Sequence, residues 1–317
     1  MRIAQKLRGA ALLLALMICL SACGRLVPED DAEDGLVIYA SFYPVYALTE
    51  LIVKDVPGVE LHCLVQPQDG CLRNYALSDW DLYLLGSAAD MVVIGGRGLE
   101  AFESSLYALG EQGPAVLTAF AELTLYNEAA GEGSEDSSHW ETTNPHAYMS
   151  PALAKDALEA IAEALSLYDP ARASLYAENL QAGRKRLDDL ETAMREAAAD
   201  FRGRKVLVLN EALVYTAQAL ELEIDGWFSR ESGQALSESE FARFQEAVAG
   251  SEARVVLVEK QAPASLIDQL ESAGYCVARV DILSEIREAS GADGYFAAQN
   301  ASAEAVAEAF GKINEAN

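Results

Sequence analysis

Residues able to perform acid–base or metal chemistry are few in this chain, which contains three histidines among 317 residues. His62 lies in an apolar run and His139 in the polar, acidic segment 127–143, whereas His146 stands shortly before a predicted helix start. The chain contains no Gly-x-Ser-x-Gly, Gly-x-x-x-x-Gly-Lys or His-Glu-x-x-His sequence. These motifs mark hydrolases, phosphate-binding loops and zinc proteases. The chain therefore offers no motif of these catalytic classes, and we do not expect an enzyme.

The cysteines follow no disulfide or zinc-finger pattern. Cys19 and Cys23 lie near the N-terminus, and Cys63, Cys71 and Cys276 are spread over the rest of the chain. Three remaining thiols without a Cys-x-x-Cys pair argue against both a disulfide framework and a zinc knuckle. Cys63 and Cys71 are close enough in sequence to bridge, but their spacing leaves that question open.

The N-terminus has the pattern of a secretory signal peptide, predicted over residues 1–22: basic residues, an apolar run at 10–20, and small residues before Cys23. The apolar run spans roughly 20 Å as a helix, less than the ~30 Å hydrocarbon layer. Leu20-Ser21-Ala22-Cys23 resembles the lipobox of bacterial lipoproteins, whose cysteine is acylated. We therefore expect an extracytoplasmic protein that Cys23 anchors to the bacterial cell membrane or its periplasmic face, with residues 23–35 as a flexible tether.

Acidic residues outnumber basic ones, and the net charge of the whole chain is −27. The predicted signal peptide contains three basic and no acidic residues, so its removal brings the charge to −30. Nucleic-acid binding requires a basic surface. The composition therefore excludes a nucleic-acid partner and predicts a soluble surface.

Short apolar runs alternate with helical patterns, which predicts an α/β fold with parallel sheets and right-handed crossovers. Several of the runs are apolar throughout, as strands buried on both faces of a sheet are. The predicted strands are Leu36–Ser41, Val59–Val65, Met91–Gly95, Lys205–Leu209, Arg254–Glu259 and Cys276–Val280. The predicted helices are Val45–Lys54, Ser78–Ala88, Pro151–Leu167, Ala212–Leu220, Glu238–Val248, Pro263–Ala273 and Ala303–Ile313.

One helical segment, Asp169–Phe201, is longer than a crossover requires. Asp169 and Pro170 are typical of a helix start, apolar residues recur at helical spacing, and Gly203 follows the end. About thirty residues make a helix on the order of 45 Å long. We predict that this helix runs the length of two lobes and sets their spacing.

Six motifs in order resemble those of the zinc- and manganese-uptake solute-binding proteins of ABC transporters, over residues 36–317. The most specific is Asn144-Pro145-His146-Ala147-Tyr148-Met149-Ser150-Pro151, where the family has Asp-Pro-His-x-Trp-x-Asp-Pro. The others are Ala40–Pro44, Pro67–Asp81 (ending Tyr75-Ala76-Leu77-Ser78-Asp79-Trp80-Asp81), Gly95-Gly96-Arg97-Gly98-Leu99-Glu100, Val258-Glu259-Lys260-Gln261 (the family's Glu-Pro-Gln) and Val280-Asp281.

The resemblance implies two Rossmann-like α/β lobes with parallel sheets, at 36–168 and 202–317, joined by one long interdomain helix at 169–201. It implies a zinc or manganese ion as transported ligand, no organic cofactor, and ABC permease and ATPase subunits as partners of a monomer. The segment around His139 matches a family loop that is often rich in histidine, and one histidine gives little support for a metal-gathering role.

Two of the family's ligand positions are retained and two are altered. His146 and Asp281 are retained, whereas Arg73 and Asn210 stand where the family has histidine. Arginine has no lone pair to offer a metal, and its charge repels a divalent cation. Asn210 offers only an amide oxygen. The chain is thus expected to be a divergent member with an altered metal site.

Three interpretations stay open at this point. In the first, Cys71 and Glu211 complete a zinc site with the two retained ligands. In the second, Arg73 pairs with Asp281 or Glu259, and the site binds an anionic or chelated solute, because guanidinium groups suit carboxylate and phosphate. In the third, the protein carries no transported ligand and acts in signalling or cell adhesion.

Overall fold

The computed structural model describes most of the chain from Gly35 onward, and Leu36 to the C-terminus form one unit. The described residues are 35–66, 72, 74–125, 144–228, 230, 234–284, 286 and 288–315. Several predictions fall outside them: the signal peptide, most of the tether, Cys23, Cys71, Arg73 and His139. In the described part of the chain, no helix is both long and apolar enough to cross a membrane.

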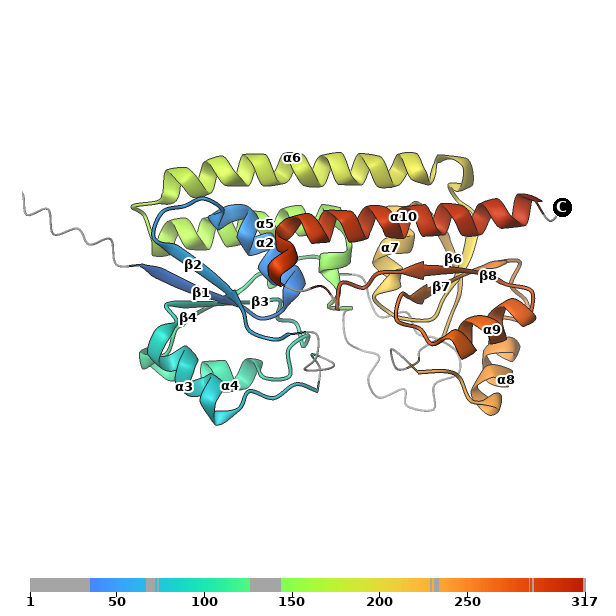
Figure 1. Cartoon of the computed structure of the whole chain (residues 1–317), viewed down its shortest axis with the longest axis horizontal. Helices are drawn as coiled ribbons and strands as arrows, with labels where there is room; N and C mark the ends of the chain where they lie inside the picture. Colours follow the sequence, from blue (N-terminus) through green and yellow to red (C-terminus); the bar gives the residue numbers. More distant parts are fainter. Residues whose placement is uncertain are drawn as a thin grey trace, which may run out of the picture. The chain divides into compact units, whose positions relative to one another are not determined.

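The first lobe contains a four-stranded parallel sheet in the order β2-β1-β3-β4. Its strands are β1 (Leu36–Ala40), β2 (Val59–Cys63), β3 (Met91–Ile94) and β4 (Ala115–Thr118). Its helices are α2 (Tyr43–Val53), α3 (Asp79–Ala88), α4 (Glu103–Tyr107) and α5 (Pro151–Tyr168). Figure 1 shows α2 and α5 over one face of the sheet and α3 and α4 over the other. Covered on both faces, β3 is buried at all four residues.

The second lobe repeats this arrangement with the order β6-β5-β7-β8, again entirely parallel. Its strands are β5 (Lys205–Val208), β6 (Glu223–Trp227), β7 (Val255–Glu259) and β8 (Cys276–Val280). Its shorter helices are α7 (Leu213–Ala219), α8 (Glu238–Ala247) and α9 (Ala264–Ser272). Two parallel sheets covered by helices confirm the predicted α/β class.

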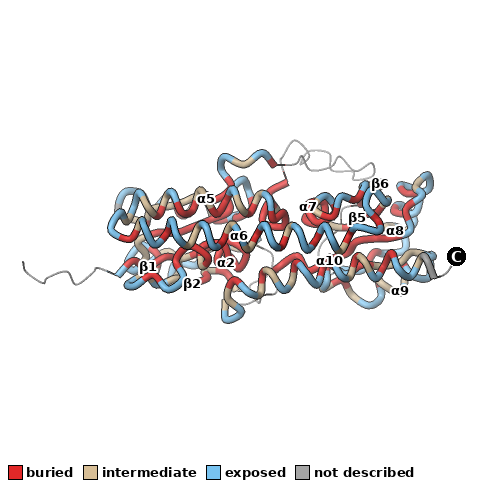
Figure 2. Tube along the Cα trace, turned by 90° about the horizontal axis from the view of Figure 1, so that it is seen from above, coloured by how far each residue is buried: buried red, intermediate tan, exposed pale blue. Residues whose placement is uncertain are grey.

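Two helices of 25 residues each, α6 (Ala173–Ala197) and α10 (Gly291–Glu315), connect the lobes. Helix α6 packs against α5 and α2 of the first lobe and against α7 of the second. Helix α10 packs against β8 and also against α2 and α6 (Figures 1 and 2). The long connecting helix was predicted, but α10 begins twelve residues before the predicted start at Ala303. The domain boundaries remain a prediction, and α10 contributes to both lobes.

The buried face of α6 shows why so polar a helix is stable there. Its buried residues are Tyr176, Gly183, Leu187, Leu190 and Met194, which recur at helical spacing. Gly183 permits close packing, because a Cβ at this position would lie 2.7 Å from Leu158 of α5. The opposite face is exposed along the whole helix in Figure 2.

Candidate functional site

Most of the predicted site residues follow directly on parallel strands of the second sheet. Asn210 and Glu211 come after β5, Glu259 ends β7, and Asp281 follows β8. Since these three strands are neighbours, their carboxyl ends lie along one edge of the sheet. Open α/β sheets bind ligands outside this edge. The fold therefore places four of the predicted residues where a ligand is expected.

His146 is held in one orientation by Asn144. The Asn144 Nδ2 donates a hydrogen bond of 2.8 Å to the carbonyl oxygen of Glu211, which turns Oδ1 toward His146. That oxygen lies 3.2 Å from the backbone nitrogen of His146 and 2.8 Å from its Nδ1. Because an amide oxygen only accepts, Nδ1 must be the donor. In the neutral ring Nε2 then carries the lone pair that a metal ion requires.

Glu211 lies beside the same ring, with Oε1 3.8 Å from Nδ1 of His146. It is on the Nδ1 side, whereas the lone pair is at Nε2. In this conformation Oε1 of Glu211 is closer than about 4 Å to Nδ1 and beyond hydrogen-bond distance of it. Tyr215 of α7 forms a second hydrogen bond with this segment, because its hydroxyl donates to the carbonyl oxygen of Asn144 at 2.6 Å. These bonds join the His146 segment to the second lobe.

The side chain of Asn210, which stands at an altered ligand position, forms a hydrogen bond with the backbone. Its Oδ1 accepts a hydrogen bond of 2.9 Å from the amide of Ala212, just before α7. Asparagine side chains often accept a hydrogen bond from the backbone amide two residues on, in an Asx-turn. The structure thus uses the amide oxygen of Asn210 in the turn that leads into α7, where the N-cap residue, Ala212, has no side-chain capping bond of its own.

Asp281, at the second retained ligand position, is nearly buried and forms an ion pair with a lysine. Its Oδ1 accepts from the amide of Leu283 at 2.8 Å, and its Oδ2 accepts from Nζ of Lys260 at 3.0 Å. Its own amide donates to Oγ of Ser302 at 3.0 Å. The carboxylate is therefore fixed by the backbone on one oxygen and neutralised by an ammonium group on the other.

Glu259 is fully buried and forms an ion pair with the buried Arg230. Arg230 also donates to the carbonyl oxygen of Gln234 at 2.6 Å. Both carboxylates that were predicted to pair with Arg73 thus have cations from the second lobe. Sequence reasoning missed Lys260 and Arg230. For Lys260 a signal existed, since a lysine stands where the related motif Glu-Pro-Gln has proline.

The glycine-rich turn after β3 has a structural role. Glu100 is buried and accepts hydrogen bonds from Oγ of Ser41 at 2.7 Å and from the amides of Gly95 and Gly96 at 2.7 and 2.8 Å. Burial raises the pKa of Glu100, and these three hydrogen bonds oppose that rise. The turn therefore folds around the carboxylate, which is not available to a ligand.

Among the described residues, no three or more histidine, cysteine or acidic side chains are grouped so that they could hold a metal ion.

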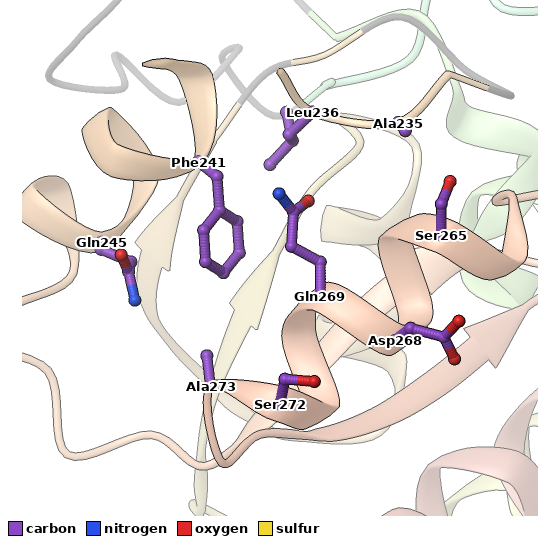
Figure 3. A pocket seen from close by; sticks show the side chains of 9 residues that line it. All are labelled: Ala235, Leu236, Phe241, Gln245, Ser265, Asp268, Gln269, Ser272 and Ala273. Atoms are coloured by element: carbon purple, nitrogen blue, oxygen red, sulfur yellow. The ribbon is translucent and has the colours of Figure 1, made fainter. Parts of the chain in front are cut away.

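A shallow hollow lies elsewhere, between α8 and α9 (Figure 3). It is lined by Ala235, Leu236, Phe241, Gln245, Ser265, Asp268, Gln269, Ser272 and Ala273. It contains none of the predicted site residues, so the strand ends remain the candidate site.

Comparison with known proteins points to one family. A family model described as ZnuA, zinc-uptake complex component A, periplasmic, matches residues 38–309. The high-affinity zinc uptake system protein ZnuA of Bacillus subtilis (strain 168) is 24% identical over 280 residues, which cover 84% of this chain and 85% of that protein.

Two solved structures show the same fold. The Zn(II)-bound ZnuA-like domain of Streptococcus pneumoniae AdcA has a TM-score of 0.71 at 21% identity and covers 87% of this chain and 98% of its own. FpvC of P. aeruginosa in complex with Ni2+ has a TM-score of 0.72 at 22% identity, with coverages of 89% and 98%. At these identities the likeness concerns the fold alone.

Proposed function

Because the chain belongs to the family of periplasmic zinc-uptake components, we propose that it is the extracytoplasmic solute-binding subunit of an ABC importer. Its cargo is a divalent metal ion, zinc or manganese, which it binds without chemical turnover and delivers as a monomer to the permease and its ATPase. The observation that carries this proposal is the fixed orientation of His146, whose Nδ1 donates to Asn144. A histidine prepared in this way presents Nε2 as a metal ligand.

The cargo would bind Nε2 of His146 and a carboxylate oxygen of Asp281. Neutral imidazole and carboxylate oxygen suit zinc and manganese. The remaining ligands are proposed to be Cys71, from the sequence that resembles the family's first ligand loop, and Glu211, which would have to turn away from Nδ1. Arg73, if it points into the site, weakens metal binding by repulsion.

Calorimetric titration of chelator-free protein with zinc and with manganese tests the proposal. We expect His146→Ala to lose one metal ligand and to bind at least tenfold more weakly. The matched control is His62→Ala, because His62 lies half-exposed on β2 and pairs with Glu60 at the surface. Equal affinities of the two variants would contradict a metal-binding role for His146.

The remaining ligands and the altered ligand positions need a separate comparison. A site completed by Cys71 and Glu211 predicts tight binding that Cys71→Ser and Glu211→Gln each abolish, with little gain from Arg73→His. A site opposed by Arg73 predicts weak binding that Arg73→His strengthens and that Asn210→His strengthens further. The same calorimetric titration distinguishes the two.

A second candidate cargo is a metal ion that arrives with an anionic chelator. It is favoured by one observation, the ammonium group of Lys260 on Asp281. A chelator carboxylate would supply Lys260 with a new partner, as it would Arg73. Titration with zinc citrate and with zinc chloride separates the two, since only a site for chelated metal prefers the citrate.

We also propose that acylation of Cys23 anchors the protein to the outer face of the cell membrane. Its support is the lipobox-like sequence at residues 20–23. Cys23→Ala should leave soluble protein in the medium or periplasm after cell fractionation. Retention of this variant in the membrane fraction would contradict the anchor.

A further inference from the structure

Two carboxylates at the ligand-binding edge of the second sheet are neutralised by the chain's own cations. Arg230 pairs with Glu259, and Lys260 pairs with Asp281. The two pairs differ in their surroundings. The side chains of Arg230 and Glu259 are 4% and 0% exposed, whereas that of Lys260 is 66% exposed although Asp281 is only 11% exposed. One pair is enclosed in the protein, and the other has its cation in water.

This difference decides which pair can open. Separation of Arg230 from Glu259 would leave a charge buried in the protein, which is strongly unfavourable. Lys260 can instead move its ammonium group fully into water, where it remains solvated, so that only the Asp281 carboxylate stays enclosed, with the Leu283 amide still bound to its Oδ1. Of the two contacts, the one with Lys260 therefore opens at the lower cost.

The environment of Asp281 does not depend on Lys260. The Leu283 amide binds Oδ1, and Ser302 binds the Asp281 amide. Both contacts come from the chain around the carboxylate and remain when Lys260 leaves. Oδ2 is thus a fixed ligand position whose occupant can be exchanged.

We propose that Lys260 is a displaceable internal cation that occupies the metal position on Asp281 and so determines the affinity of the site for its divalent cargo. This inference rests on the proposed function. The ion binds Oδ2 only after the ammonium group has left, and the displaced cation then repels it across a short, partly screened distance. Lys260 lowers the affinity and favours ions that bind carboxylate strongly enough to displace it.

The test is a calorimetric titration of zinc and of manganese into the full chain and three variants. Lys260→Gln removes the charge and should bind on the order of tenfold more tightly, since both the ion pair and the repulsion are lost. Lys260→Arg keeps the charge and should bind as weakly as the wild type. Lys205→Gln is the matched control, because Lys205 pairs with Asp225 at 3.1 Å elsewhere in the same lobe.

The outcomes separate this inference from the function beneath it. Tighter binding by Lys260→Gln, with Lys205→Gln and Lys260→Arg unchanged, supports it. If the wild type binds metal and Lys260→Gln binds no more tightly than Lys205→Gln, the inference is wrong and the proposed function stands. If neither the wild type nor Lys260→Gln, shown to be folded by circular dichroism, binds either ion at millimolar concentration, the proposed function itself is overturned.

Discussion

At the scale of single residues, the site depends on one amide side chain, that of Asn144, which has contacts at both ends. Asn144 is buried and uses both ends of its amide, one toward Glu211 and one toward His146. The related motif has aspartate here, which could not donate to the Glu211 carbonyl oxygen. In this chain one neutral side chain therefore supplies both the hydrogen bond to the Glu211 carbonyl oxygen and the orientation of the histidine.

We predict that Asn144→Ala weakens metal binding about 10- to 100-fold, because the His146 ring loses its orienting partner. It should also lower the free energy of unfolding by about 1–3 kcal/mol, since buried polar groups lose their partner. The matched control is Asn179→Ala: Asn179 donates to the carbonyl oxygens of Ile52 and Lys54, remote from the site. This control should lose stability and keep its metal affinity. A parallel loss of affinity in both variants would contradict the orienting role.

The turn after β3 allows a second prediction, in which two glycines share a backbone conformation but differ in available space. Gly96 has φ +76° and Gly98 has φ +82°. A Cβ at Gly96 would lie 2.1 Å from Cγ2 of Thr118, whereas a Cβ at Gly98 meets nothing within 4 Å. Gly98→Ala should therefore cost about 1–2 kcal/mol for the left-handed backbone. Gly96→Ala should cost about 3 kcal/mol or more, since overpacking is added to that strain. Urea denaturation compares them, and equal losses would argue against the clash.

The sequence could identify single site positions but not their partners. His146 and Asp281 were proposed as site residues because they stand within recognisable motifs, and Glu211 because it adjoins an altered one. The pairing of Lys260 with Asp281 joins neighbouring strands across 21 residues, and Arg230 reaches Glu259 from a loop 29 residues away. Such contacts depend on strand order, which no local pattern contains.

At the scale of elements, apolar runs predicted six of the eight strands in the described part of the chain and missed β4 and β6. Strand β4 has only four residues, and β6 reads Glu-Ile-Asp-Gly-Trp, with its first residue exposed and its next three only partly buried. Both lie at the edge of their sheet, as the predicted strands β2 and β8 also do, so edge position alone does not explain why they were missed. Near Gly226 the pairing of β6 with β5 also shifts register. These strands are specified mainly by the neighbours they pair with.

Helix α10 shows the same dependence on tertiary contacts. Its first turns contain glycine, aspartate and asparagine, which are poor helix formers, so the prediction began at Ala303. Hydrogen bonds of two buried side chains offset this low helix propensity. The Tyr295 hydroxyl donates to the carbonyl oxygen of Tyr148 at 2.8 Å, and Nε2 of Gln299 donates to the carbonyl oxygen of Met149 at 3.1 Å. The early part of α10 is thus stabilised by the segment that carries His146.

The start of α10 is capped by another helix, which gives a third prediction. The carboxylate of Glu50, on α2, accepts a hydrogen bond from the amide of Ala292. Glu50→Ala removes this cap and should lower the free energy of unfolding by about 1–2 kcal/mol. Glu304→Ala is the control, because Glu304 is exposed on the same helix. Urea denaturation measures both, and a loss no larger than that of Glu304→Ala would contradict a capping role.

At the scale of the whole molecule, the two lobes are joined by more than a flexible connection. Both α6 and α10 contact elements of the two lobes and contact each other. Polar contacts at the start of α10 add to this packing. The Tyr43 hydroxyl donates to the carbonyl oxygen of Gly291 at 2.7 Å, and Arg186 forms an ion pair with Asp293 at 2.6 Å. A hinge between the lobes would have to bend two continuous helices, and helices bend sharply only at defects such as proline.

The last prediction follows from this double connection: metal binding should change the spacing of the lobes very little. Small-angle X-ray scattering with and without zinc should give radii of gyration within about 1 Å, since neither α6 nor α10 contains a proline. Ala182→Pro supplies the comparison, because Ala182 is exposed in the middle of α6 and its replacement should kink that helix at a cost of about 3 kcal/mol. If α6 maintains the spacing, this variant should respond to zinc more than the wild type does. A decrease of several ångström in the wild type would show that the lobes close around the ion despite both helices.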